Sequence, residues 1–274
     1  ISRVLTFSAT LNFLIGERGC RKTYSVLRYM VNQYIKKGNQ FVYLRRYKSD
    51  LKKVLPTFFT ALINNNEFPD HELKVKGNQF YIDGNVAGYA LILSTAQDLK
   101  GANFDNVVNI CMDEFIIDEG QKKYYLNNEV EVFLGAIESI SRTRNTRIFL
   151  LGNAGNLITN PYFIYFGLSI PSQSDIRTYK NGLILLQYMK NDDYREMKSK
   201  TKFGQLVSGT NYERYAILNE DTRINNDFIE KKKGTARFNF AIIYNGLTFG
   251  IWFDFSEGKI YVSYDYYKDN YNNL

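Results

Sequence analysis

The chain of 274 residues holds only two cysteines, Cys20 and Cys111, and a single histidine, His71. This scarcity excludes a zinc site built from cysteines and histidines, and it excludes any catalytic triad that needs more than one histidine. Two cysteines in loop or apolar settings suit a reducing compartment. His71 lies in the stretch FPDHEL, and we interpret it as a structural loop residue rather than a catalyst.

Long apolar runs and targeting signals are also missing. No stretch reaches the roughly 18 uninterrupted apolar residues of a membrane-spanning helix, so we expect no membrane partner. No cleavable signal, internal repeat or low-complexity tract is visible. The base-reading motif Asn-Lys-x-Asp, which GTPase specificity requires, is absent. Because Ile1 is not a natural start, we expect residues to be missing before it.

The charge balance favours an anionic partner. Lysine and arginine number 35 against 28 for aspartate and glutamate, a formal net charge of +7. This suits a nucleic acid, a nucleotide or an acidic protein surface. The codon bias of an A/T-rich genome is the alternative source of the lysines. Hydrophobic residues make up 45% of the chain, enough for a buried core.

Strand and helix patterns alternate through the first two thirds of the chain. Apolar runs predict strands at 11–16, 40–46, 106–115, 146–154 and 182–188. Helical periodicity predicts helices over 22–37, 48–64 (interrupted by a proline) and 128–141. Residues 73–93 alternate and contain glycine turns, which predicts a hairpin. Strands that are apolar on both faces indicate an α/β fold with a mostly parallel central sheet.

One loop between a predicted strand and a predicted helix has the layout of a phosphate-binding site. Residues 16–23 read GERGCRKT, and a Walker A loop needs a glycine, four residues and then Gly-Lys-Ser/Thr. The candidate nucleotide-binding residues are Gly16, Glu17, Arg18, Gly19, Cys20, Arg21, Lys22 and Thr23. Lys22 would neutralise phosphates and Thr23 would bind Mg²⁺. A chance strand-turn-helix is the alternative interpretation.

Arg21 stands where the second glycine of the pattern belongs. Glycine lets the backbone take dihedral angles that cost other residues energy. Arginine fits if those angles are ordinary and its side chain points outward; otherwise the loop is strained by about 1 kcal/mol or more. We favour the outward, tolerated arrangement.

Three further motifs suit the same chemistry. The apolar run VVNICMDE ends in Asp113, a candidate Mg²⁺ ligand, and Glu114, a candidate base for the attacking water. FLLGNAG ends in Asn153, a candidate γ-phosphate contact. SRTRNTR clusters Arg142, Arg144 and Arg147, which would complete a neighbour's active site or lie in a solvated loop.

With these elements the sequence resembles the DNA-packaging motor ATPases of phi-twenty-nine-like bacteriophages, relatives of the large terminases. The motifs that carry the resemblance are FVYLRRYK, FPDHELKVKG, FYIDG, AGYA, MDEFI, GNA, NPYF, KFGQLVSGT, FIEK and IIYNGLTFGIW. The resemblance implies an additional-strand P-loop ATPase that uses ATP and Mg²⁺ to drive double-stranded DNA into an empty procapsid. It also implies a ring of identical subunits, usually a pentamer, at the portal in the host cytoplasm, together with a packaging RNA.

The resemblance assigns roles to single residues. It makes Lys22 and Thr23 the phosphate-loop pair, Asp113 the Walker B acid and Glu114 the catalytic acid. Arg142 aligns with an arginine finger that acts in trans, and Lys48 with a basic residue that faces a neighbouring subunit or DNA. Arg21 departs from the family's usual glycine, which puts nucleotide affinity or rate in doubt.

We divide the chain into a P-loop ATPase domain (1–190), a polar linker or lid region (191–225) and a small β-rich module (226–274). The resemblance implies that this module is RNase H-like, and it ends early enough that we expect a C-terminal segment to be missing. Its first strand carries no acid, so we expect no nuclease activity. Lys231, Lys232 and Lys233 lie at its approach as candidate contacts to DNA, RNA or the procapsid, or as a solvated charge run.

Two other functions remain open at this point. One is a structural subunit that binds nucleic acid or procapsid and whose ATP site is impaired by Arg21. The other is a helicase or partition-type P-loop ATPase.

Overall fold

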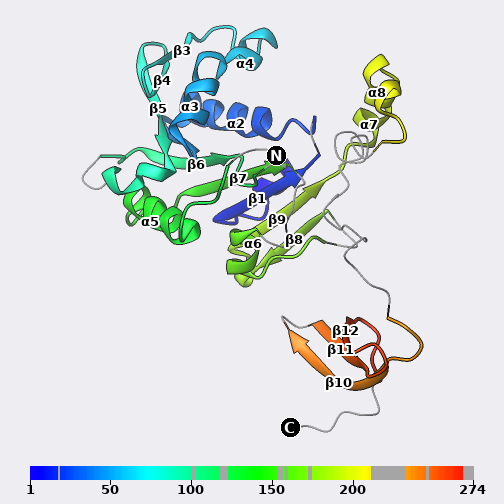
Figure 1. Ribbon diagram of the computed structural model, residues 1–274. Coiled ribbons are helices and arrows are strands. Elements are labelled where there is room, and N and C mark those ends of the chain that lie inside the picture. The colour runs from blue at the N-terminus through cyan, green and yellow to red at the C-terminus, as the bar shows by residue number, and fades with distance from the viewer. Residues whose placement is uncertain are drawn as a thin grey trace. The chain divides into compact units, whose positions relative to one another are not determined.

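A computed structural model describes residues 1–17, 19–99, 103–117, 123–153, 157, 160–171, 175–210, 232–244 and 247–267 (Figure 1). The chain divides into two compact units, Ile1–Thr222 and Arg223–Leu274, and each contains its own β-sheet.

A mixed sheet of nine strands, in the order β3-β4-β5-β2-β6-β7-β1-β9-β8, forms the centre of the first unit. Its parallel part comprises β5 (Asn85–Ile92), β2 (Gln40–Arg45), β6 (Val107–Asp113), β7 (Arg147–Asn153), β1 (Leu11–Gly16) and β9 (Ile184–Met189). The antiparallel strands are β3 (Leu73–Lys76), β4 (Gln79–Ile82) and β8 (Ile176–Tyr179). Because β7 lies between β1 and β6, the sheet has the extra strand expected of an additional-strand ATPase.

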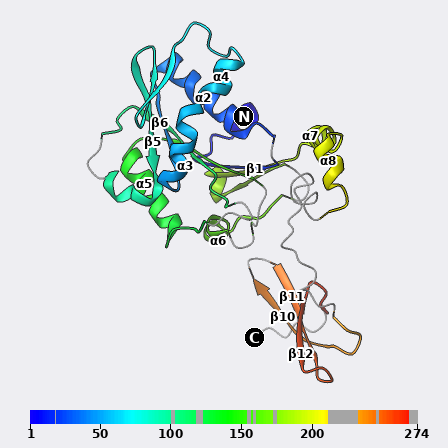
Figure 2. The same cartoon turned by 45° about the horizontal axis from the view of Figure 1, so that its top comes forward.

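Helices cover both faces of this sheet (Figures 1 and 2). One core contains residues of α2 (Lys22–Lys37), α3 (Lys48–Val54) and α4 (Thr60–Asn64), and the other contains residues of α5 (Glu129–Ser141) and α6 (Pro161–Phe166). Strand β7 contributes Phe149 and Leu151 to the core on the side of α2, and Ile148 and Leu150 to the core on the side of α5. Both faces are therefore buried, which explains why the strands read as continuous apolar runs. The short helices are α1 (Ser2–Leu5), η1 (Leu55–Thr57), η2 (Leu93–Leu99) and η3 (Lys180–Gly182).

Most predicted elements are confirmed. Helix α2 has the predicted bounds and ends at Gly38, whose φ of 70° is the left-handed geometry that glycine adopts readily at a helix end. The region 48–64 forms three short helices around Pro56. Helix α6 was not predicted, although Asn160 caps it by accepting from two backbone N–H groups and Pro161 follows at the first position. That cap is the signal that could have revealed it.

The linker region contains two helices that its composition did not reveal. Helix α7 (Asp192–Ser199) begins after Asn191, whose side chain accepts a hydrogen bond from the Tyr194 N–H. Helix α8 (Lys202–Val207) begins after Thr201, which caps the Gly204 N–H in the same way. No helix among the described residues is long and apolar enough to cross a membrane.

The second unit contains three antiparallel strands, β10 (Arg237–Tyr244), β11 (Leu247–Asp254) and β12 (Lys259–Ser263), in keeping with the β-rich module expected from the sequence. Trp252 and Tyr261 pack with Ala236 and Phe238 in a small core. The specific likeness to RNase H stays a prediction.

Candidate active site

The carboxyl ends of β6 and β7, the loop that follows β1 and the start of α2 border a cavity of about 510 Å³. Its walls are formed by Gly19, Arg21, Lys22, Thr23, Tyr24, Asp113, Glu114, Leu151, Gly152 and Asn153. Parallel strands end at a common edge, and here Gly16 pairs with Asn153 while Asp113 pairs with Leu151. The fold therefore brings together three of the four sequence motifs.

Close packing explains the two glycines of the loop. A Cβ on Gly16 would lie 2.4 Å from the carbonyl oxygen of Met189, and a Cβ on Gly19 would lie 2.8 Å from the Tyr194 ring. The Cys20 thiol points toward β9, 3.7 Å from the same Met189 oxygen, and burial raises its pKa. Arg18 lies outside the described residues.

Lys22 reaches across the loop. Its Nζ donates to the carbonyl oxygens of Gly16 (2.9 Å) and Glu17 (2.8 Å) and to Asn153 Oδ1 (3.4 Å). The ammonium group thus lies at the mouth of the loop with Asn153 beside it, which fits a phosphate-binding lysine with an adjacent polar group that senses the same phosphate.

Thr23 and Asp113 face each other across the cavity. The Thr23 hydroxyl lies 3.3 Å from both carboxylate oxygens of Asp113. Hard oxygen ligands of this kind fit Mg²⁺, which is commonly bound by one or two protein groups together with waters and substrate phosphates. No cluster of three or more acidic, histidine or cysteine side chains able to hold a metal occurs within the described parts of the chain.

Two neighbours from β2 hold Asp113 in place. The Tyr43 hydroxyl donates to Asp113 Oδ2 (2.8 Å), and Arg45 Nη1 lies 3.5 Å from the same oxygen. Burial, reinforced by the charge of Asp113, raises the pKa of Tyr43 well above its usual value, so the phenol stays a proton donor. Sequence reasoning missed both residues; the only signal was the arginine pair that ends an apolar run.

Glu114 has an unusual backbone. Its φ is 58°, in the left-handed region that costs non-glycine residues energy, and its N–H donates to Asp113 Oδ1 (3.1 Å). The carboxylate is half-exposed and bonds Arg45 Nη2 at 2.5 Å. Arg45 therefore contacts both acids of the site, Asp113 and Glu114, and positions the side chain of Glu114, the candidate base.

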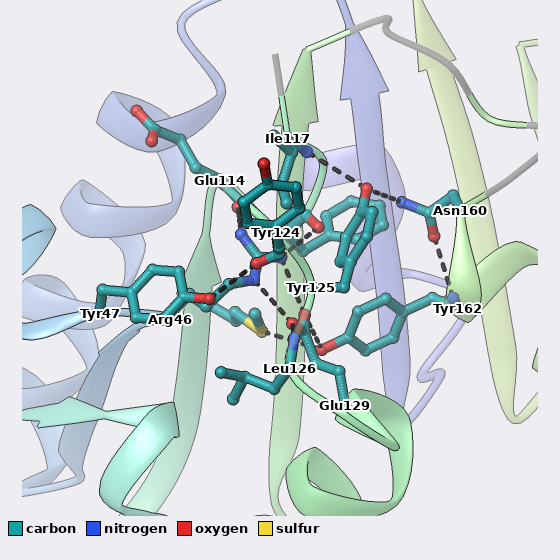
Figure 3. Close-up of polar contacts among 12 residues, drawn as sticks. Arg46, Tyr47, Glu114, Ile117, Tyr124, Tyr125, Leu126, Glu129, Asn160 and Tyr162 are labelled. Atoms are coloured by element: carbon teal, nitrogen blue, oxygen red, sulfur yellow. Dashed lines mark hydrogen bonds and ion pairs between the residues drawn. The ribbon is translucent and has the colours of Figure 1, made fainter. Parts of the chain in front are cut away.

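A buried ion pair supports that backbone from below (Figure 3). Arg46 makes two hydrogen bonds to the Glu129 carboxylate, at 2.7 and 2.8 Å, and both side chains are buried. The same guanidinium donates to the carbonyl oxygens of Glu114 (3.1 Å) and Phe115 (2.7 Å). The Glu114 side chain points away from this network (Figure 3). Removing one partner of such a pair costs about 3–5 kcal/mol, so the pair is well suited to maintain the strained turn.

The arginine cluster lies at the opposite edge of the sheet. Strand β7 begins at Arg147 and ends at Asn153, a span of about 20 Å at about 3.3 Å per residue. Arg142, Arg144 and Arg147 line a separate cavity of about 740 Å³ at that edge. None of the three is near its own chain's phosphate loop.

Arg142 and Arg144 differ in their surroundings. Arg142 is exposed just after α5 and has a φ of 50°. Arg144 Nη2 donates to the carbonyl oxygens of Phe104 (2.8 Å) and Ile140 (2.5 Å), which ties two segments together. Arg142 is therefore the more exposed of the two, whereas Arg144 joins two segments of its own chain.

None of the other described candidate lysines is among the residues that line the cavity. Lys48 is exposed at the start of α3, which follows β2 at the same sheet edge as the site. In the second unit Lys232 pairs with Asp265 (2.5 Å) and stacks 3.1 Å from the Trp252 ring centre, and Lys233 pairs with Glu257 (2.9 Å). Lys231 lies outside the described residues.

The side chain of Arg21 is exposed, as in the outward arrangement that we favoured from sequence, while its backbone is strained. Its φ of 52° and ψ of 30° are left-handed, although its side chain is exposed. Arg21→Gly should relieve about 1 kcal/mol of strain, so we expect greater stability, with ATP affinity preserved or raised up to about fivefold. Titration with a fluorescent ATP analogue and urea denaturation measure both effects. Asn128→Gly, at another left-handed helix start, is the control that should leave ATP affinity alone.

Weaker ATP binding in Arg21→Gly would contradict this prediction. It would mean that the guanidinium contacts a phosphate or a neighbouring subunit.

Asp254 of the second unit has its oxygens occupied by local donors. The hydroxyls of Ser256 (2.6 Å) and Thr235 (2.5 Å) and the N–H groups of Ser256 and Glu257 bond its carboxylate. The Ser256 and Thr235 hydroxyls in particular lower its pKa from 3.8 to about 2. A carboxylate held in this way stabilises a turn and is poorly placed to bind catalytic metal ions.

The lowered pKa predicts acid sensitivity of the second unit. The unfolded chain takes up the proton first, so the stability from Asp254 is fully present above about pH 4 and is lost as the pH falls toward 2. Trp252 is the only tryptophan and lies in this unit, so its fluorescence during urea unfolding measures the effect. Asp254→Asn should unfold more easily at pH 6 and show a smaller further loss between pH 4 and 2. An equal loss in both proteins would refute the assignment.

Comparison with known proteins agrees with the resemblance seen in the sequence. The model of the family described as podovirus DNA encapsidation protein (Gp16) matches residues 2–273. A DNA packaging protein of Bacillus phage B103 is 39% identical over 264 residues, which is 96% of this chain and 80% of the relative.

Two solved structures are similar over most of their length. The N-terminal domain of the DNA packaging ATPase from bacteriophage phi29 is 39% identical, with a TM-score of 0.62 over 69% of this chain and 94% of that one. The bacteriophage phi29 viral genome packaging motor assembly contains a chain 34% identical, with a TM-score of 0.68 over 99% of this chain and 84% of that one. This chain belongs to the podovirus DNA encapsidation protein (Gp16) family.

Proposed function

We propose that this protein is the ATP-hydrolysing motor subunit that moves double-stranded viral DNA into an empty procapsid. The observation that carries the proposal is the convergence of Lys22, Thr23, Asp113 and Glu114 on one cavity, although they come from segments about 90 residues apart. A chain that only bound DNA would have no physical need for all four groups in one place.

The site residues divide the work of ATP hydrolysis. The loop N–H groups and Lys22 would bind the phosphates, and Thr23 and Asp113 would hold Mg²⁺, which neutralises phosphate charge when bound. Glu114 would accept a proton from the attacking water. Asn153, which already lies beside Lys22, would contact the γ-phosphate or that water.

Arg45 limits when Glu114 can act. Its guanidinium pairs with the carboxylate, so the base must leave this partner or share it before it accepts a proton from water.

A ring of identical subunits accounts for the position of Arg142. Because Arg142 lies at the far edge of its own sheet, it would stabilise the transferring phosphate of a neighbouring subunit. Lys48 would contact DNA or that neighbour, and Lys231, Lys232 and Lys233 would contact DNA, packaging RNA or the procapsid. The net charge of +7 suits the nucleic acids among these partners.

A structural subunit with an impaired ATP site is the second candidate, and the left-handed Arg21 is the observation that favours it. Phosphate release by the purified protein, with and without double-stranded DNA, separates the two. A motor releases phosphate, faster with DNA, and Lys22→Ala abolishes the release by weakening ATP binding. A structural subunit binds DNA but releases no phosphate above the Lys22→Ala background.

A further inference from the structure

The phosphate loop contains a carboxylate whose negative charge opposes phosphate binding. Glu17 lies between the two loop glycines, and none of its surface is exposed. Its carbonyl oxygen accepts from Lys22 Nζ, the group proposed to bind phosphates. A buried negative charge on so short a loop repels phosphates strongly unless another group neutralises it.

That neutralising group comes from helix α7, far along the chain. Arg195 Nη2 forms an ion pair with Glu17 Oε1, and the Asn191 N–H donates to Glu17 Oε2 at 3.2 Å. The first turn of α7 and its cap residue also contact the loop at Gly19. Asn191 Nδ2 donates to the Gly19 carbonyl oxygen (3.3 Å), and the Tyr194 ring packs on Gly19. Three side chains of one short segment thus dock on the phosphate loop.

The docking makes the charge of the loop depend on the position of α7. While α7 is docked, the charges of Glu17 and Arg195 cancel, and the cations Arg21 and Lys22 line the cavity. If α7 moves away, the carboxylate loses its cation and stays beside the phosphates. In sequence, α7 and α8 lead into the segment that joins the two units.

We propose that Arg195 is a positioning residue for nucleotide binding, which neutralises Glu17 only while α7 is docked and so couples phosphate affinity to the linker region. This inference rests on the proposed ATPase function. It extends the site to a helix that belongs to neither Walker motif.

Binding titrations on the full chain with fluorescent ATP and AMP analogues test the proposal. Arg195→Ala should weaken ATP binding about tenfold and AMP binding less, because ATP brings more negative charge to the loop. Glu17→Gln should bind ATP more tightly than the parent. The double variant Glu17→Gln/Arg195→Ala should return to within about threefold of the parent. Lys200→Ala, which removes an exposed cation just after the same helix, should change nothing.

Rescue by the double variant separates charge from folding, since a merely structural Arg195 would not be repaired by removing a second side chain. The proposal is overturned if Arg195→Ala binds ATP normally, or if the double variant stays as weak as Arg195→Ala. Lys22→Ala in the same titration separates a failure of the proposed nucleotide site from a failure of the proposed coupling to α7. If Lys22→Ala also binds ATP normally, the proposed nucleotide site itself is wrong; if it binds weakly while Arg195→Ala does not, only the coupling is wrong.

Discussion

Glu114→Gln is expected to bind Mg·ATP with near-parental affinity and to hold it unhydrolysed. The amide keeps the size of the side chain and can still accept from Arg45, so the left-handed turn should persist. It cannot accept the proton of the attacking water, and loss of a general base costs about a hundredfold to ten-thousandfold in rate. Single-turnover hydrolysis of radiolabelled ATP measures the rate, and filter binding measures the trapped nucleotide.

Lys22→Ala is the matched comparison for Glu114→Gln. It should lose ATP binding itself, because the cation that faces the loop carbonyls and Asn153 is gone. The pair therefore separates binding from chemistry. Turnover by Glu114→Gln near the parental rate would remove Glu114 from the role of base.

Arg142→Ala subunits are expected to bind ATP and yet fail to hydrolyse it in a ring. Arg142 precedes the amino end of β7, which is about 20 Å long at about 3.3 Å per residue, and its own phosphate loop lies at the carboxyl end. Its effect is therefore expected on a neighbour. Charges aimed at a transferring phosphate contribute about a thousandfold or more in related chemistry. Mixing Arg142→Ala with Glu114→Gln subunits should restore activity, because some interfaces then join an intact Glu114 to an intact Arg142.

Arg144→Ala is the control for that experiment. Arg144 bonds two backbone carbonyl oxygens, so its loss should lower stability and should not be complemented in mixed rings. If no mixture with Arg142→Ala regains activity while folded Arg144→Ala is inactive and complemented, the finger is Arg144.

The chemistry of the site was readable from short segments of sequence. Lys22 and Thr23 follow a buried strand at Walker spacing, and Asp113 with Glu114 ends another, because both motifs depend on residues close together along the chain. The bounds of α2 followed in the same way from helical periodicity and from Gly38. Local spacing is sufficient where one strand, one turn and one helix build the whole feature.

Tertiary structure alone decided which side chains support and restrain those groups. Arg45 meets Glu114 across 69 positions, and Arg195 meets Glu17 across 178, because strand order and helix docking place them together. No local pattern encodes such pairs, since their partners are set by which elements become neighbours in the fold. Tertiary structure also decides the strain at Arg21. The sequence showed an arginine in place of a glycine, and only the folded loop determined that its φ is positive.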